Sequence, residues 1–489
     1  MLKNKIIRDT SSTTIASYLT KFIGLFRGFI VAKLLDPSSY GYFSGLSLIF
    51  LYNSQAHLGI LHGLNRKLSL SKGAGQLETY DELKNNGITA IVFLSFLFAG
   101  IIFAYSFWVD DAYSSELKWG FRFYAVLSVM FHLQYILHSL LRVEHRFKEI
   151  AKSNLLFSLS NLVLVLGLAY YFRFYGVLIA FLMSLFLQDY YLYYVNKVNV
   201  KFQFNIPVVK ELLLIGAPIS FAYLIDVILN SIDRLMIAIF LTSKELGFYG
   251  IGLTLSSEFL LQLPNSISYV IYPRLLEKFG KYKNYNALLD LFQTSSAVVA
   301  CVMSIVVGVL FIAVDYLIPY LLPRYVDAIP VAKILIFSSY FISINQIAVR
   351  VMITTGKTNK LVQFQVIVIL LNVLLNYFMI KNGFGINGVA VATAVSYFVY
   401  SICVTHYTLG KFFNRFLSSI KEQVLLYLPL IYVCFLLGMI LRFNFSESMI
   451  THNFLFDFFS CSFKISLLII LYAPVIFINF KKIKAHLNV

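Results

Sequence analysis

The chain has 489 residues, of which 59% are hydrophobic and only 13% are charged. Because a soluble domain carries about 25% charged residues, this composition excludes a large water-soluble protein. The formal net charge of +17 follows mainly from the membrane topology predicted below, so nucleic acid is not expected as a partner.

Apolar segments recur along the whole chain and are separated by short polar or charged turns. Each is long enough to cross a bilayer, which takes about 20 mostly apolar residues. We therefore predict an all-α, polytopic membrane protein with about 14 transmembrane helices, without room for a folded domain outside the membrane. The spans are expected at residues 13–33, 41–63, 86–108, 120–140, 153–172, 175–195, 212–239, 248–272, 290–312, 329–353, 361–380, 386–407, 424–441 and 458–480.

The basic residues between these spans are distributed unevenly between the two sides of the membrane. With the N-terminus inside, 26 of the 40 Lys and Arg residues fall in cytoplasmic segments, seven fall on the opposite side, and seven lie within spans. An excess of Lys and Arg marks the cytoplasmic side of a membrane protein. The bias predicts a multi-pass protein with both termini in the cytoplasm.

An internal repeat is visible at an offset of just over 200 residues. "LLDPSSYGYFSGL" at 34–46 returns as "FLTSKELGFYGIG" at 240–252, and "FYGVLIAFLMS" at 174–184 returns as "INGVAVATAVS" at 386–396. Between these matches, Asn161 corresponds to Asn372. The repeat predicts two six-helix lobes, 1–200 and 201–410, followed by an extra helix pair, 411–489. Six spans return the chain to the same side, so the repeat is parallel, as in transporters with a substrate path between the halves.

Several of these segments carry a family resemblance over nearly the whole chain. The arginine-bearing first span, "LLDPSSYGYFSG" and "SQAHLGILHGLNR" (54–66) resemble the bacterial polysaccharide repeat-unit flippases. The segments at 210–252 and 385–396 are similar to the second half of the same proteins, which belong to the multidrug/oligosaccharidyl-lipid/polysaccharide exporter (MATE-like) superfamily. "TKFIGLFRGFIVAKLL" (20–35) is also similar to peptidoglycan-precursor flippases, although Gly28 stands where they usually carry an acidic residue.

The resemblance implies transport of an undecaprenyl-pyrophosphate-linked oligosaccharide from the cytoplasmic to the periplasmic leaflet by alternating access. It also implies a place in the bacterial cytoplasmic (inner) membrane, in O-antigen, lipopolysaccharide or exopolysaccharide synthesis. The implied partners are the lipid-linked substrate, membrane lipids, and a polysaccharide polymerase with its chain-length machinery. A multidrug exporter, or an exporter of another lipid-linked precursor, remains the alternative within the superfamily.

Charged side chains inside the spans mark the candidate site, because each costs about 2.5–3.5 kcal/mol at the centre of a helix. The repeat offset of 206 places Asp233 at the position equivalent to Arg27. We predict two matching helical stripes: Thr20, Gly24 and Arg27 in the first span, and Asp226, Asn230 and Asp233 in the seventh. Arg27 and Asp233 either line a central cavity or form a structural ion pair.

Substrate contacts are assigned by chemistry. Arginine forms bidentate hydrogen bonds to phosphate, so Arg27 and Lys21 are the candidates for the pyrophosphate, with Arg234 beside them in the cavity. Polar groups in the middle of the second span, Asn53, Gln55 and His57, either contact sugar hydroxyls or hydrogen bond between helices. The acidic residues Asp226, Asp233 and Glu258 are candidates for gating and for proton or sodium coupling.

Nothing in the sequence indicates an enzyme. Nucleophile, nucleotide-binding and zinc-protease motifs are absent, and the four cysteines lie in apolar segments without metal-ligand spacing. We therefore expect no catalytic residues, no metal and no cofactor. A membrane polysaccharide polymerase or ligase would need a large periplasmic loop, which the sequence lacks.

Overall fold

The structure is a computed structural model that describes residues 19–109, 115–197, 200–413, 416–442 and 454–487. Within these residues the protein is helical, without strands. Ten of the described helices are long and apolar enough to cross a membrane. The all-α, multi-pass architecture predicted from the sequence is confirmed. The chain divides into two compact units, Met1–Ser231 and Ile232–Val489.

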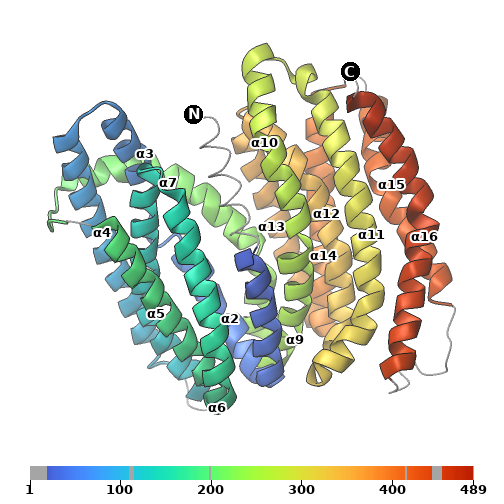
Figure 1. The fold of residues 1–489 in the computed structure, drawn as a ribbon, viewed down its shortest axis with the longest axis horizontal. Helices are drawn as coiled ribbons and strands as arrows, with labels where there is room; N and C mark the ends of the chain where they lie inside the picture. Colours follow the sequence, from blue (N-terminus) through green and yellow to red (C-terminus); the bar gives the residue numbers. More distant parts are fainter. Residues whose placement is uncertain (1–18, 110–114, 198–199, 414–415, 443–453, 488–489) are drawn as a thin grey trace. The chain divides into compact units, whose positions relative to one another are not determined.

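The first unit contains seven helices in its described part, shown in blue to green in Figure 1. The first is described over residues 19–34. It is followed by α2 (Pro37–Asn53), α3 (Ile60–Gly73), α4 (Leu77–Tyr105), α5 (Ser115–Val143), α6 (Phe147–Asn196) and α7 (Ile206–Leu229). Helix α3 packs against α4, α5 and α7, while α5 packs against α4 and α6. A core of buried leucine and isoleucine side chains from α3, α4, α5 and α7 fills the space between these helices.

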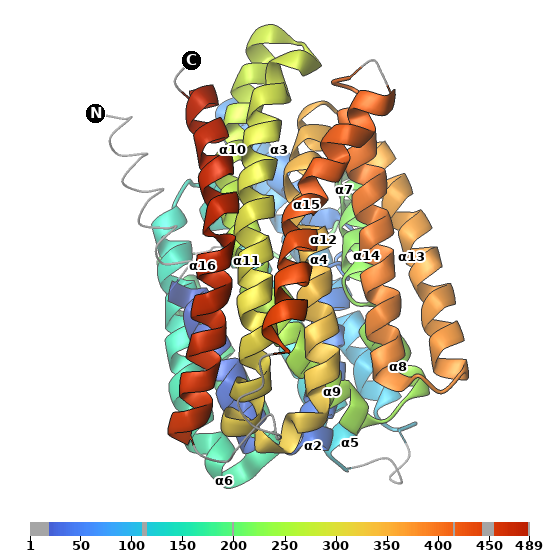
Figure 2. The ribbon, with the colours of Figure 1, turned by 90° about the vertical axis from the view of Figure 1, so that its right-hand side faces the viewer.

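The second unit is built around α12 and α14. Its elements are α8 (Ile232–Phe240), α9 (Ser243–Leu253), the π-helical segment η1 (Thr254–Leu260), α10 (Gln262–Tyr282), η2 (Tyr285–Leu288), α11 (Leu289–Leu321), η3 (Pro323–Ala328), α12 (Ile329–Thr354), α13 (Thr358–Lys381), α14 (Gly385–Leu409), α15 (Phe416–Ile440) and α16 (Phe454–Leu487). Helix α12 packs against α14 and α11, and α13 packs against α14 and α8. Helices α15 and α16 both lie on α11 (Figure 2).

Most predicted spans correspond to single helices, but α6 contains two of them, 153–172 and 175–195. The helix turns sharply at Arg173, where φ is +50°. The Arg173 guanidinium donates a hydrogen bond of 3.0 Å to the carbonyl oxygen of Leu34. The turn therefore lies where the sequence predicts a connection. The first predicted span, 13–33, begins outside the described residues.

The second predicted span, 41–63, is wrong as a continuous helix. Helix α2 ends at Asn53, turns occupy residues 54–59, and α3 begins at Ile60. Leu58 and Gly59 have left-handed backbone conformations, with φ of +53° and +96°. A left-handed residue cannot continue a right-handed helix. Gln55 and His57 consequently lie in this break and not in the middle of a helix.

The seventh predicted span, 212–239, is also interrupted. Helix α7 ends at Leu229 and α8 starts at Ile232, so the stripe of Asp226, Asn230 and Asp233 on one helix is wrong. The Asn230 side chain donates to the carbonyl oxygen of Asp226 (2.7 Å), and the Ser231 hydroxyl donates to that of Val227 (2.7 Å). Side chains that bond nearby backbone groups in this way compete with the helix. The eighth predicted span, 248–272, is likewise divided by the π-helical segment η1.

The repeat is confirmed at the level of hydrogen bonds. In the first lobe, the Asn161 amide donates to the Ser184 hydroxyl at 3.2 Å. In the second, Asn372 donates to Ser396, also at 3.2 Å. Each serine in turn donates to the carbonyl oxygen four residues earlier. These equivalent bonds connect equivalent pairs of helices, so the two lobes share one fold.

Helix starts also correspond between the lobes. Asp36 caps the N-terminus of α2 and Thr242, 206 residues later, caps α9. The predicted lobes 1–200, 201–410 and 411–489 follow this repeat, whereas compact packing divides the chain after Ser231. The reason for the difference is that α7 begins the second repeat in sequence but packs on α3. Helices α15 and α16 pack within the second unit.

Two carboxylates share one hydroxyl group where α2 begins. The Ser39 hydroxyl is 2.7 Å from the Asp36 carboxylate and 2.8 Å from that of Glu116, yet it has one proton to donate. Burial raises the pKa of the Glu116 carboxyl, the bond to Ser39 lowers it, and the Asp36 charge raises it further, so that it lies above its ordinary value. Ionised Glu116 therefore costs stability at neutral pH, and this cost disappears as the pH falls below the unfolded-state pKa, about 4.3.

We expect Glu116→Gln to stabilise the protein at neutral pH. The neutral amide can bond Ser39 without repelling Asp36, so the unfolding temperature should rise by up to ~2 °C at about pH 7.5. At about pH 4 the variant and the parent should unfold at the same temperature, because Glu116 is then protonated in both the folded and the unfolded state. Thermal unfolding in detergent at the two pH values measures this difference. At each pH, the quantity compared is the unfolding temperature of the variant minus that of the parent. A smaller difference at pH 7.5 than at pH 4 would contradict the assignment.

Candidate functional site

Arg27 is held in place within the first unit by α6. Its side chain is half-buried on the helix described over 19–34. The Nη1 group donates a hydrogen bond of 2.9 Å to the Oδ1 atom of Asn161. The amide of Asn161 is itself oriented by its bond to Ser184. The first lobe therefore presents a guanidinium whose orientation is set by a neutral amide, a geometry suited to binding an anion.

The other two predicted charges of the first unit are exposed. Lys21 is exposed on the same helix as Arg27. Asp226 is exposed near the end of α7. Their proposed roles in pyrophosphate binding and gating stay predictions.

The three polar residues predicted to contact sugar stabilise the α2–α3 break in this structure. Asn53 is 1% exposed, and its amide accepts from the Ser128 hydroxyl (2.7 Å) and donates to the Ser128 carbonyl oxygen (3.4 Å). Gln55 accepts a hydrogen bond of 2.7 Å from Ser220 on α7. His57 is 1% exposed and accepts one of 3.0 Å from the Gly59 N–H group. The contacts of Asn53 and Gln55 are the interhelical hydrogen bonds that the sequence leaves as the alternative to sugar binding, whereas the His57 bond is local to the turn.

Asp233 is the centre of a polar cluster in the second unit. Its carboxylate is 3% exposed and accepts hydrogen bonds from the Tyr249 hydroxyl (2.5 Å) and from the Arg234 N–H group (2.7 Å). The Tyr249 hydroxyl also lies 3.4 Å from that of Thr393. Helices α8, α9 and α14 thus bring a carboxylate and two hydroxyl groups together in an apolar lobe. Such a cluster can take up a proton or a small cation.

The remaining predicted residues of the second unit are less closely engaged. Arg234 is half-buried beside Asp233, and its Nε atom has no hydrogen-bond partner in the part of the chain that the structure describes. The side chain of Glu258 is outside the described part of the structure. Among the described residues, no group of three or more His, Cys, Asp or Glu side chains could hold a metal ion.

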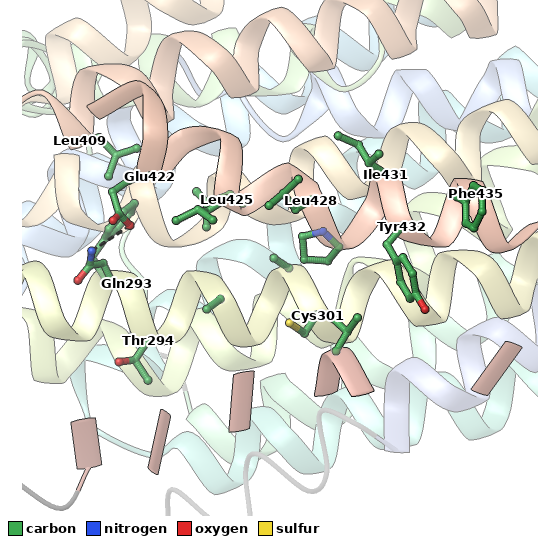
Figure 3. Close-up of a pocket in the computed structure, with 16 residues that line it drawn as sticks. Gln293, Thr294, Cys301, Leu409, Glu422, Leu425, Leu428, Ile431, Tyr432 and Phe435 are labelled. Atoms are coloured by element: carbon green, nitrogen blue, oxygen red, sulfur yellow. Dashed lines mark hydrogen bonds between the residues drawn. The ribbon is translucent and has the colours of Figure 1, made fainter. Parts of the chain in front are cut away.

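An apolar cleft of about 940 Å³ lies along α15 in the second unit. Figure 3 shows α11 on one side and α15 on the other, with Cys301 and Tyr432 facing the space between them. At one end, the Gln293 amide donates a hydrogen bond of 3.0 Å to the Glu422 carboxylate. The other residues that face the cleft are almost all apolar, among them Leu425, Leu428, Ile431 and Phe435. A cleft of this shape and polarity suits a hydrocarbon chain.

Sequence reasoning missed the residues that position the two charges. Asn161 marks the repeat in the sequence analysis, but its contact with Arg27 was not predicted. Tyr249 and Thr393 beside Asp233 were also missed. The sequence contained a partial signal for Asn161. An asparagine recurs at the repeat offset inside two apolar spans, and burying its amide there is unfavourable without a hydrogen-bond partner.

Comparison with known proteins agrees with this architecture. Residues 30–324 match the family described as "Polysaccharide biosynthesis protein". No curated protein shows a significant match to the chain.

Three solved structures share the fold. The lipid II flippase MurJ, in an inward closed conformation, is 17% identical with a TM-score of 0.67, covering 95% of this chain and 99% of MurJ. An inward-facing multidrug resistance MATE family transporter of the MOP superfamily is 14% identical with a TM-score of 0.64, covering 83% of this chain and 95% of its own. A MOP superfamily transporter from Pyrococcus furiosus, described as having a binding pocket of reverse polarity, is 17% identical with a TM-score of 0.55, covering 86% and 96%. At these identities the likeness shows a common fold. Because the family match spans more than half of the 489 residues, the chain belongs to the polysaccharide biosynthesis protein family, with a MATE- and MurJ-like fold.

Proposed function

We propose that this protein is a flippase that moves an undecaprenyl-pyrophosphate-linked oligosaccharide from the cytoplasmic to the periplasmic leaflet of the bacterial cytoplasmic membrane. The observation that carries the proposal is Arg27, an arginine kept inside an apolar helix by a dedicated partner, Asn161, in a polysaccharide biosynthesis protein. No covalent bond of the substrate changes in this process, so the protein acts as a transporter and not as an enzyme.

The pyrophosphate is the part of such a substrate that hydrocarbon rejects most strongly. A guanidinium compensates its charge with paired, charge-assisted hydrogen bonds. Asn161 holds one end of the Arg27 side chain, which reduces the rotational entropy that phosphate binding would otherwise remove. Lys21, exposed on the same helix, would add positive charge on the path to Arg27.

The polyprenyl tail needs an apolar surface while the head group crosses. The cleft between α11 and α15 supplies one, because its walls are mostly apolar. Its polar end, at Gln293 and Glu422, would be less favourable for the tail than the apolar walls.

Coupling to an ion gradient is assigned to the second lobe. Asp233 is buried, and protonation or cation binding there would remove or balance its charge. Such a change alters the hydrogen bond from Tyr249 and thereby the packing of α8 on α9. Transport measured with and without an imposed proton or sodium gradient tests this role, and gradient-independent transport would exclude it.

Reconstitution with a defined cargo tests the function directly. Liposomes containing the protein should move a fluorescent undecaprenyl-pyrophosphate oligosaccharide between leaflets faster than protein-free liposomes. Undecaprenyl phosphate without sugar and a cationic drug serve as the comparison cargoes. Transport of the drug without transport of the lipid-linked sugar would overturn the proposal and favour a multidrug exporter.

A further inference from the structure

Three histidine rings surround the break between α2 and α3 in the first unit. His57 lies in the break, His62 in the first turns of α3, and His132 on α5. The centre of the His57 ring is 5.1 Å from that of His62 and 6.4 Å from that of His132, and both pairs meet edge to face. We call these three residues the histidine cluster. The whole chain has eight histidines, and three of them gather at this one helix break.

The hydrogen bond made by His57 requires its neutral form. Its Nδ1 atom accepts a hydrogen bond of 3.0 Å from the Gly59 N–H group. This bond closes the turn at the left-handed residues Leu58 and Gly59. A protonated imidazole carries hydrogen on both nitrogens and cannot accept. Proton binding at Nδ1 would therefore remove the bond and set two N–H groups against each other.

His132 and His62 supply nitrogen atoms that can take up a proton. His132 Nδ1 is 2.9 Å from the carbonyl oxygen of Ser128, so Nδ1 carries the hydrogen and Nε2 carries the lone pair. Nε2 is buried and has no hydrogen-bond partner among the described residues, and His132 as a whole is 1% exposed. The Nε2 atom of His62 is also buried, and nothing in the described part of the chain hydrogen bonds to it.

The helices packed around the cluster contribute aromatic and basic groups. Tyr223 of α7 stacks on His62 with ring centres 5.2 Å apart, and Tyr135 of α5 lies 6.3 Å from His132. Arg142 of α5 contributes a positive charge near His62. No carboxylate hydrogen bonds or pairs with any of the three rings in the described residues. A positive charge on the cluster is therefore compensated only if the break opens to water.

We propose that the histidine cluster is a proton-binding site that opens the α2–α3 break when it is protonated. The opening would be transmitted to α7, because Gly59 and Gly63 contact the backbone of α7 directly at Gly216 and Leu212. The three histidines are different residues from Arg27 and from the carboxylates considered for coupling, and the site is defined without reference to the cargo.

Distances between spin labels on the two helices test the proposal without any substrate. Ser38 on α2 and Ser69 on α3 can be replaced by cysteine after the four native cysteines, all in the second unit, are changed to serine. We expect one main distance at about pH 8 and a second distance at about pH 5.5. In the parent protein, the open state should be populated below ~10% at the higher pH, and its population should rise about tenfold at the lower pH.

Substitutions of His57 give opposite and specific outcomes. In His57→Asn, the amide oxygen replaces Nδ1 as the acceptor but cannot be protonated, so the high-pH distance should persist at both pH values. In His57→Phe the acceptor is lost, so the low-pH distance should appear at both. His132→Gln removes the open nitrogen and should reduce the response to pH. His145→Asn, a histidine in the loop before α6, is the matched control and should respond as the parent does.

Two results would overturn the proposal. The first is a parent protein whose distances do not change between pH 8 and pH 5.5. The second is a His57→Asn variant that keeps the full pH response. Because no cargo is present, either result leaves the proposed flippase function untouched, and failure of that function leaves this test intact.

Discussion

Arg27→Ala should abolish flipping of a lipid-linked oligosaccharide while the amount of protein in the membrane stays unchanged. The variant loses the charge-assisted hydrogen bonds that would carry the pyrophosphate through the apolar lobe. Each such bond contributes about 1.5–3 kcal/mol, so the rate should fall by at least ~100-fold. Arg27→Lys keeps the charge but cannot bind phosphate in the bidentate mode, and should retain partial activity.

The matched control is Arg122→Ala on α5. Arg122 is also a half-buried arginine of the first unit, but its guanidinium lies over the rings of Trp119 (4.7 Å) and Phe107 (5.3 Å). This variant removes one positive charge from the same lobe, and transport should be retained. The leaflet assay in liposomes measures both variants, with protein content checked by blotting. Normal transport by Arg27→Ala would contradict the assignment of Arg27 to pyrophosphate binding.

Gly216→Ala should unfold the first unit or prevent its assembly. A Cβ atom on Gly216 would lie 1.9 Å from the carbonyl oxygen of Gly59 and 2.7 Å from the Gly63 nitrogen. These are backbone atoms, so they cannot rotate away as a side chain would, and α3 must separate from α7. We expect a loss above ~4 kcal/mol in the free energy of unfolding, the range seen for severe core defects.

Gly167→Ala on α6 controls for the glycine-to-alanine change itself. Apart from the backbone of its own helical turns, no atom of the described residues lies within 4 Å of the position its Cβ would occupy. Alanine favours a helix over glycine by about 1 kcal/mol, so this variant should be as stable as the parent or slightly more so. Thermal unfolding followed by size-exclusion chromatography compares the three proteins. If Gly216→Ala melted within a degree of the parent, the close contact of α3 with α7 would be refuted.

The sequence predicts the fold class well because hydropathy is a local property. Membrane helices satisfy their own backbone hydrogen bonds, so a long apolar segment between charged turns is already a structural unit. The repeat can also be recognised from the sequence alone. In the structure, Asn161 donates a hydrogen bond to Ser184, and Asn372 donates the equivalent one to Ser396. The predictions of continuous helices at 41–63, 212–239 and 248–272 are wrong because the helix breaks inside these segments leave their hydropathy unchanged, so a hydropathy pattern cannot reveal them.

The candidate site also contains some residues that the sequence identified and others that only the structure identified. The rarity of charges in apolar spans was enough to single out Arg27 and Asp233. Their partners, Asn161 on α6 and Tyr249 on α9, lie 134 and 16 residues away in the chain, and only folding brings them into contact. Neither partner carries a charge, so neither is conspicuous in the sequence.

By itself, the sequence determined that this is a helical membrane protein of two repeated lobes with a few buried charges, since these properties follow from the hydrophobicity and order of residues along the chain. Only the tertiary structure decided where helices break and which groups those charges contact. At the break between α2 and α3, Gly59 lies against Gly216 of α7, which is 157 positions later in the chain. Such contacts depend on the packing of helices distant in sequence, which no local pattern records.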